Sequence, residues 1–287
     1  MFTKKTIRDI DVQDKRVLLR ADYNVPLDEH GNITADYRLT QSVQTIKALQ
    51  EKNVRLIICS HLGRPDGKRD DKLSLAPVAK ELSKLLGQDV QFVHDCIGPE
   101  VEQAAAALQP GQILLLENLR FHPEEEANDD GFAAELAKLA DVFVQDGFGV
   151  VHRAHASTDA ITRHLPSVAG LLLEKEVDTI SNVMNNPKRP LAAVVGGAKI
   201  ADKIDVLNRF IELADFIAIG GAMANTFLVA KGIKVGKSKY DKDELELAHQ
   251  LLDKAAEKSK AQRFTLYLPQ DGVVATTTDK TAQTRLV

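Results

Sequence analysis

Three arginines and a histidine follow short apolar runs, and a fourth arginine opens a predicted helix. These residues are Arg38, His61, Arg64, Arg120 and Arg153. A guanidinium donates two parallel N–H bonds to two oxygens of a carboxylate or a phosphate. The formal net charge is −4, so a basic composition does not explain this gathering of cations. The pattern predicts a site for a small anionic substrate, and the competing interpretation is that each arginine pairs with a surface carboxylate.

The segments that directly follow the first two apolar runs bring other residues to the same predicted site: Asp22, Tyr23, Asn24, His61, Leu62, Gly63 and Arg64. In an open sheet of parallel strands, ligands bind at the carboxyl ends of the strands. We therefore expect these segments to lie together at one edge of one sheet.

The histidines do not predict a metal site. His61, His122, His152 and His155 fit no usual zinc spacing, and no cysteine joins them. We expect His61 to donate a hydrogen bond to an anion and His155 to be a hydrogen-bonded interior residue. No Ser stands in a G-x-S-x-G turn, so nucleophilic catalysis is weakly supported.

Two glycine pairs in the second part of the chain each end an apolar run and precede a predicted helix: Gly196-Gly197 and Gly220-Gly221. Glycine lets a phosphate approach the backbone, and a helix start supplies free N–H groups. Lys199 and Lys203 are four residues apart, which predicts that they share one face of that helix. The pattern favours a polyphosphate site, and tight helix–strand packing with solvated lysines is the alternative. It matches neither a Walker A sequence nor a dinucleotide fingerprint.

Short apolar runs alternate with helical periodicity along the chain, which predicts an α/β fold. In the first part, strands are expected at 16–20, 54–60, 90–93, 113–119 and 141–146, with helices at 38–53, 73–87, 99–109 and 130–140. In the second part, strands are expected at 191–197, 215–221 and 263–269, with helices at 199–214, 222–232 and 243–261. This order predicts two doubly wound parallel sheets in two Rossmann-like lobes.

The predicted domains are 1–167, which binds the small anion, and 184–287, which binds the polyphosphate. A helix over 168–183 joins them, because Pro166 precedes it and proline-containing turns follow it. The last segment, 273–287, loses periodicity and has no predicted closing element. One anionic ligand in each lobe suggests transfer of a group between the two ligands.

Composition indicates an ordinary globular protein: 287 residues, 44% hydrophobic and 27% charged, with a mean hydropathy of −0.18. The two cysteines, Cys59 and Cys96, cannot form a disulfide framework, which favours a reduced, cytoplasmic setting. No apolar run reaches the ~18 residues of a membrane span. The charge balance gives no reason to expect a nucleic acid or a membrane as partner.

Six motifs resemble phosphoglycerate kinase from about residue 5 to about residue 275: RADYNVPLD, SHLGRP, LLLENLRF, FGVVHRAHAST, VVGGAKIADKI and IGGAMANTFL. The resemblance implies a monomer that moves a phosphoryl group between 1,3-bisphosphoglycerate and ADP, with Mg²⁺, to give 3-phosphoglycerate and ATP. It implies that the phosphoglycerate is held by Asp22, Asn24, Arg38, His61, Arg64, Arg120 and Arg153. Tyr23, Leu62 and Gly63 lie between these residues and belong to the same predicted site.

For the nucleotide, the resemblance implies contact with Lys203, a position for Lys199 near the transferring group, and a wall around the adenine that includes Gly220 and Gly221. Gly196 and Gly197 complete the predicted nucleotide-binding set. Arg38, Lys199 and Lys203 are the predicted catalytic residues, because phosphoryl transfer depends on positioning and charge neutralisation.

The sequence also departs from the family. Gln145, Gly147, Val150 and Val151 stand where the family more often has Asn, Ala, Thr and Ala. The family continues beyond the end of this chain, with a Trp-Asn-Gly-Pro motif and a Gly-Gly-Gly-Asp-Thr loop that the chain lacks. In the family, that loop cradles nucleotide phosphates and its Asp helps to hold magnesium.

We therefore expect an incomplete and poorly stable second lobe, no metal ligand in this chain and little or no activity. The alternative is a catalytically dead fragment that still binds 3-phosphoglycerate. A nicotinamide-dependent dehydrogenase is a weaker third interpretation, because the glycine fingerprint is absent.

Overall fold

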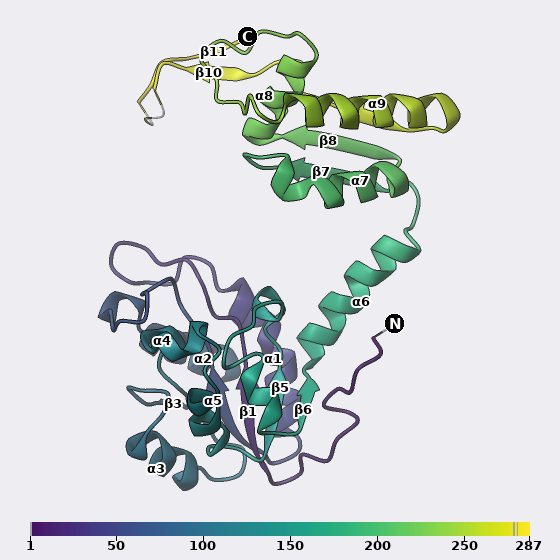
Figure 1. The fold of residues 1–287 in the computed structure, drawn as a ribbon. Helices are drawn as coiled ribbons and strands as arrows, with labels where there is room; N and C mark the ends of the chain where they lie inside the picture. The colour runs from purple at the N-terminus through teal and green to yellow at the C-terminus, as the bar shows by residue number, and fades with distance from the viewer. Residues whose placement is uncertain (1, 278, 280) are drawn as a thin grey trace. The chain divides into compact units, whose positions relative to one another are not determined.

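The protein is described by a computed structural model that covers residues 2–277, 279 and 281–287. The chain divides between Ser181 and Asn182 into two units, unit 1 before this point and unit 2 after it (Figure 1). Within the described ranges, no helix is both long and apolar enough to span a membrane.

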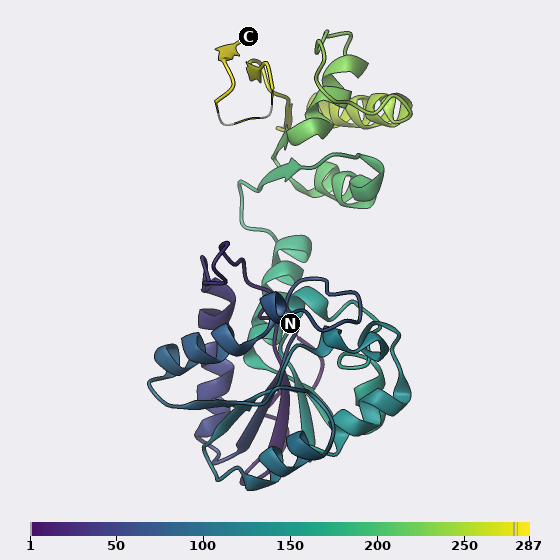
Figure 2. The same ribbon diagram turned by 90° about the vertical axis from the view of Figure 1, so that its left-hand side faces the viewer.

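Unit 1 contains a six-stranded parallel sheet with the order β3-β4-β2-β1-β5-β6 (Figure 2). Its strands are β1 (Arg16–Arg20), β2 (Arg55–Cys59), β3 (Val90–Phe92), β4 (Ile113–Leu115), β5 (Val142–Gln145) and β6 (Ser167–Ala169). In the centre of the sheet, Val17 pairs with Leu56 on one side and with Val142 on the other. The central strands are buried on both faces, as their continuous apolar sequences predict.

The helices cover both faces of this sheet. They are α1 (Tyr37–Gln50), α2 (Ala76–Leu86), α3 (Pro99–Ala107), α4 (Pro123–Glu126) and α5 (Asp130–Ala137). α1 and α2 pack with Leu19 and Ile58 on one face, whereas α3 and α5 pack with Leu18 and Ile57 on the other. Right-handed crossovers explain the two layers, because the strand order first runs from β1 to β2 and β3 and later returns toward β5 and β6. The prediction of a doubly wound sheet is confirmed here.

Local signals set the ends of α2, which spans Ala76–Leu86 within the expected range 73–87. Leu75 is the N-cap residue, and Pro77 stands in the first turn. N–H groups in the first turn have no partner within the helix, so proline, which has no N–H, costs no hydrogen bond there. Gly87 caps the C-terminus with a φ of 68°, a left-handed conformation that glycine adopts without strain.

The segment after Pro166 differs from the prediction. A helix was expected from residue 168, but Ser167–Ala169 form β6 at the edge of the sheet, and α6 spans Leu171–Asn185. β6 pairs with β5, and its backbone also bonds to Lys5 and Ile7. These long-range hydrogen bonds cannot be read from the helical periodicity that starts immediately afterwards.

Unit 2 contains a three-stranded parallel sheet with the order β7-β8-β9. Its elements are β7 (Ala192–Gly196), the 3₁₀ turn η5 (Ala201–Lys203), α7 (Ile204–Leu213), β8 (Phe216–Gly220), α8 (Gly221–Ala230), α9 (Leu245–Ala261) and β9 (Thr265–Tyr267). An antiparallel pair follows, β10 (Val273–Ala275) with β11 (Thr284–Leu286). The expectation that 273–287 holds no closing element is therefore wrong.

Only one face of the β7–β9 sheet carries a helix layer in the part of unit 2 that the structure describes. Ala193, Val195, Ile217 and Ile219 are buried against α7, α8 and α9, whereas Val194, on the opposite face, is 83% exposed. The strand order advances in one direction, so right-handed crossovers place every helix on the same side. An α/β fold with an incomplete second lobe is confirmed.

The two faces of this sheet predict opposite mutational effects. Ile217→Ala, in the covered layer, should lower the free energy of unfolding of unit 2 by about 2–4 kcal/mol, because it leaves a cavity. Val194→Ala, on the open face, should change it by less than about 0.5 kcal/mol. Urea unfolding of the two variants measures both values, and equal losses would contradict the one-sided packing.

Candidate active site

The predicted substrate-binding residues come together at the carboxyl edge of the unit 1 sheet. Segments 22–24, 61–64 and 146–153 follow β1, β2 and β5, and Arg120 lies in the 3₁₀ turn η2 (Leu119–Phe121) after β4. These four strands are neighbours in the order β4-β2-β1-β5. Parallel pairing therefore brings their loops to one edge, as the sequence predicts.

Two hydrogen-bonded contacts tie these loops to one another. Arg38, in the first turn of α1, forms an ion pair with Asp22. Asn24 Oδ1 accepts a bond of 2.9 Å from the backbone N–H of Gly63. Gly149 lies against the ion pair, and a Cβ atom at this position would fall 2.4 Å from Asp22 Oδ2. A side chain at position 149 would therefore displace the Asp22 carboxylate from its present place.

Guanidinium groups converge around His61, which is buried. Burial lowers the pKa of His61 to about 2, and Arg20, Arg120, Arg38 and Arg153 lower it further in the same direction. The imidazole is therefore neutral at physiological pH. Its Nδ1 lies 3.4 Å from Arg20 Nη2. Since arginine can only donate, Nδ1 accepts and Nε2 carries the proton, which leaves one N–H donor for an anion, as expected.

Arg120 is buried at the same edge and is held in place on two sides. Its Nη1 donates to Gly63 O over 2.9 Å, and its Nε lies 3.0 Å from Glu126 Oε1. Burial lowers the pKa of Arg120. By contrast, Arg64 and Arg153 are exposed, and the described residues form no ion pair with either. Their charges are available to a ligand.

Two members of the predicted set do not present their side chains. Tyr23 is fully buried, and its hydroxyl bonds to Ser42 Oγ at 2.9 Å, while Leu62 is also buried in the core. Burial raises the pKa of the Tyr23 hydroxyl. Both residues stay in the predicted site through their backbone only, because their side chains face the core.

A buried polar network under the site was not predicted. Arg20, the last residue of β1, is fully buried, and its Nε donates to Ser157 Oγ at 2.8 Å. Its Nη2 lies 3.9 Å from Glu125 Oε1, and Glu125 accepts a further bond from Ser157 N. His155 is interior as expected, but its Nδ1 makes no hydrogen bond within the described residues. Arg20 resembles an ordinary strand-end arginine in sequence, so no local signal marks it.

Asp146 anchors the start of α6. Its Oδ1 accepts from the backbone N–H groups of Leu172 (2.9 Å) and Leu173 (3.1 Å). Gly170 makes this approach possible, because a Cβ there would fall 2.1 Å from the same oxygen. Burial raises the pKa of Asp146 to about 6, against the opposing effect of these hydrogen bonds.

In unit 2, Gly196 ends β7 and Gly220 ends β8, as the sequence predicts, and the structure brings the two glycine pairs together. Gly196 and Gly220 pair across β7 and β8. Gly221 has a φ of 68°, and a Cβ there would lie 2.9 Å from Gly197 O. Lys203 extends beside Gly197, with its Cε 3.1 Å from the position of a Cβ on that glycine. One ammonium group and two glycine turns therefore lie together.

The predicted arrangement of the two lysines is wrong. Lys199 precedes η5 and α7, so it does not share a helical face with Lys203. The carboxylate of Glu244 accepts from Ile200 N (2.6 Å) and Ala201 N (3.1 Å). This carboxylate holds the segment in a turn and occupies N–H groups that were expected to be free for a phosphate.

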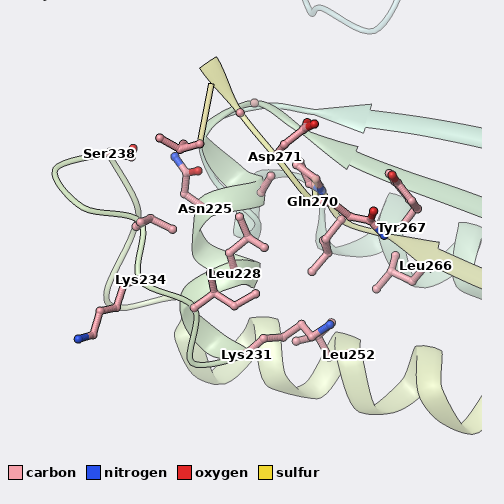
Figure 3. Close-up of a pocket in the computed structure, with 18 of the residues that line it drawn as sticks. Asn225, Leu228, Lys231, Lys234, Ser238, Leu252, Leu266, Tyr267, Gln270 and Asp271 are labelled. Carbon is pink, nitrogen blue, oxygen red and sulfur yellow. The ribbon is translucent and has the colours of Figure 1, made fainter. Parts of the chain in front are cut away.

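A cavity of about 1360 Å³ lies between α8, α9 and the segments after β9 (Figure 3). Of the predicted nucleotide-binding residues, Gly221 alone lines it. Figure 3 shows Asn225, Leu228, Lys231 and Leu266 around the same space. These residues come from distant segments, so no local pattern in the sequence marks them.

Comparison with known proteins decides the family. The phosphoglycerate kinase family model matches residues 7–287. The chain belongs to the phosphoglycerate kinase family. The phosphoglycerate kinase of Moorella thermoacetica is 52% identical over 274 residues, which are 96% of this chain and 68% of that protein. The corresponding protein of Desulforudis audaxviator is 53% identical over 95% of this chain and 68% of its own length.

Solved structures of phosphoglycerate kinases agree with this assignment. The Coxiella burnetii structure has a TM-score of 0.78 at 38% identity and matches 99% of this chain and 71% of its own chain. The Pyrococcus horikoshii structure has a TM-score of 0.85 at 28% identity, over 99% of this chain and 70% of its own. This chain thus spans about 70% of the length of these phosphoglycerate kinases.

The predicted nucleotide-binding residues of this phosphoglycerate kinase chain do not fit a magnesium ion. Mg²⁺ prefers carboxylate and phosphate oxygens, whereas these positions supply glycines and lysines, and the neighbouring Glu244 carboxylate already binds backbone N–H groups. Within the described ranges, the one group of three possible metal ligands lies in unit 1, at Asp95, Cys96 and His122.

Asp146 predicts a pH-dependent stability. Its pKa is raised in the folded state, so the folded state keeps a proton that the unfolded state loses, and stability falls as pH rises from about 4 to about 7. The free energy of unfolding of the wild type minus that of Asp146→Asn should fall by about 2–3 kcal/mol over this range. Urea unfolding at several pH values measures it. Asp89→Asn, an exposed control, should show no such trend, and a flat difference for Asp146→Asn would contradict the buried carboxyl.

Proposed function

We propose that unit 1 binds 3-phosphoglycerate or 1,3-bisphosphoglycerate. The observation that carries this proposal is the convergence of guanidinium groups on a buried, neutral His61 at the carboxyl edge of the sheet. Crowded cations repel one another, so an anion is the ligand that relieves this arrangement. A three-carbon acid phosphate carries an anionic group at each end, which suits arginines contributed by several loops.

The roles follow from the contacts. Arg64 and Arg153 are exposed without a paired carboxylate among the described residues, so they donate to phosphate or carboxylate oxygens. His61 donates its Nε2–H. Asp22 orients Arg38, and Asn24 and Arg120 fix the backbone of Gly63. Tyr23 and Leu62 contribute only through their backbone and through packing.

We propose that unit 2 binds ADP or ATP. Lys203 beside the Gly197–Gly221 contact supports a phosphate position, since glycine backbone and an ammonium group can both approach phosphate oxygens. The cavity that includes Gly221 has room for a nucleoside. We propose that Lys199 and Lys203 in unit 2, and Arg38 in unit 1, are the catalytic residues, because charge neutralisation is the main requirement of phosphoryl transfer.

The proposed reaction is that of phosphoglycerate kinase in glycolysis, transfer of the phosphoryl group between 1,3-bisphosphoglycerate and ADP. We further propose a monomer in the cytoplasm. For this chain alone we propose little or no turnover, because the helix start expected to hold phosphate is occupied by Glu244. The same observation favours the second candidate, a fragment that binds 3-phosphoglycerate without catalysis.

Binding of 3-phosphoglycerate tests unit 1. Arg38→Ala should weaken binding about 10–100-fold, since a hydrogen bond to a charged group contributes about 1.5–3 kcal/mol. Isothermal titration calorimetry on the full chain measures the affinity. Arg163→Ala is the matched control, because Arg163 pairs with Asp130 and Asp159 instead of lying in the site. Equal affinities in all three proteins would refute the site.

A coupled assay for ATP formation separates the two candidates. Supplied with 1,3-bisphosphoglycerate and Mg-ADP, this chain should bind substrate yet form ATP at a rate near background. A rate comparable to that of a phosphoglycerate kinase of full family length would overturn the binding-fragment candidate. Lys203→Ala serves as the comparison, and it should abolish whatever rate remains.

A further inference from the structure

Three metal-ligating side chains lie together at the rim of unit 1, apart from the residues assigned to substrate. Asp95 and Cys96 follow β3, and His122 follows β4 by way of η2. β3 and β4 are adjacent parallel strands, with Phe92 paired to Leu115. The loops after the two strands therefore leave the sheet at the same edge.

The donor atoms of these three residues lie within 4.8 Å of one another. His122 Nε2 is 2.7 Å from Asp95 Oδ1, which also accepts a 2.7 Å bond from the backbone N–H of Cys96. The ring of His122 also packs against Phe132, at a centroid distance of 5.3 Å. The imidazole and the carboxylate are thus already oriented toward each other beside the thiol.

The Cys96 thiol is fully buried and makes no disulfide. It takes part in no hydrogen bond within the part of the chain that the structure describes. Burial raises its pKa, and the neighbouring charges of Asp95 and Glu125 act in the same direction. The local field is therefore anionic, which opposes a free thiolate but attracts a cation.

We propose that Asp95, Cys96 and His122 form a binding site for a thiophilic divalent cation of the Zn²⁺ class. The ion would bind Cys96 Sγ, His122 Nε2 and a carboxylate oxygen of Asp95, with water as the fourth ligand. The thiol proton is released to solvent as the metal–sulfur bond forms. Bound Zn²⁺ links the loop after β3 to the loop after β4.

The donor set and the spacing both favour zinc over magnesium. Thiolate and imidazole are zinc ligands, whereas magnesium takes oxygen ligands. Tetrahedral zinc, with bonds of about 2.0–2.3 Å, separates its ligand atoms by roughly 3.3–3.8 Å. The Asp95–His122 pair has to open by less than about 1 Å, and the thiol has to approach by a similar amount, changes within the reach of side-chain rotation.

Cobalt substitution tests the site directly. Titration of the full, reduced chain with Co²⁺ should produce a near-ultraviolet thiolate-to-metal absorption band, and Zn²⁺ should displace it. The band should persist in Cys59→Ser, which removes the other buried cysteine, and disappear in Cys96→Ser. Addition of Zn²⁺ should raise the melting temperature of the wild type but not that of Cys96→Ser.

Two further variants keep the test decisive if Cys96→Ser fails to fold. Asp95→Asn and His122→Gln change partly exposed side chains, and each should weaken Co²⁺ binding at least about tenfold, which is about 1.4 kcal/mol. His152→Gln, an exposed histidine elsewhere in unit 1, should bind as the wild type does. The proposal is overturned if the wild type shows no band, if the band is lost in Cys59→Ser instead, or if both ligand variants bind unchanged.

Discussion

The handedness of the crossovers between parallel strands is the constraint on which the rest of unit 1 depends. Each right-handed crossover places its helix on the face set by the direction of the step, so the reversal of direction after β3 puts helices on both faces of the sheet. Parallel pairing then brings four strand ends to one edge. Every arginine assigned to the substrate lies on a loop or helix turn at that edge. A different strand order would leave the same residues on separate surfaces.

The second determinant of the site is its electrostatic balance. Arg20 and Arg120 are both buried near His61, an arrangement that is unfavourable unless carboxylates compensate. Glu125 and Glu126 supply that compensation from the short helix α4. The buried Glu125 and the exposed Glu126 keep these cations in place, while Arg64 and Arg153 remain open to solvent. Arg20 and Arg120 are thus held by carboxylates of the protein, whereas Arg64 and Arg153 are the guanidinium groups that we propose for binding.

Unit 2 shows the same constraint with a different result. Its strand order advances in one direction, so its helices cover one face and the opposite face of β7 stays open. The glycine turns lie against each other, and Glu244 accepts hydrogen bonds from the adjacent backbone N–H groups. Right-handed crossovers therefore give a sheet covered on both faces in unit 1 and a sheet covered on one face in unit 2.

The sequence by itself determined the α/β class, most strand and helix positions, the family and the gathering of Arg38, His61, Arg64, Arg120 and Arg153. These features follow from local periodicity and from the rule that ligands bind at the carboxyl ends of parallel strands. Residues close together in the sequence are enough to apply both. Tertiary structure alone decided that Tyr23 faces the core, that Glu244 caps the turn at Ile200, and that Cys96 lies beside His122. Each of these depends on contacts between residues far apart in the chain, which no local pattern encodes.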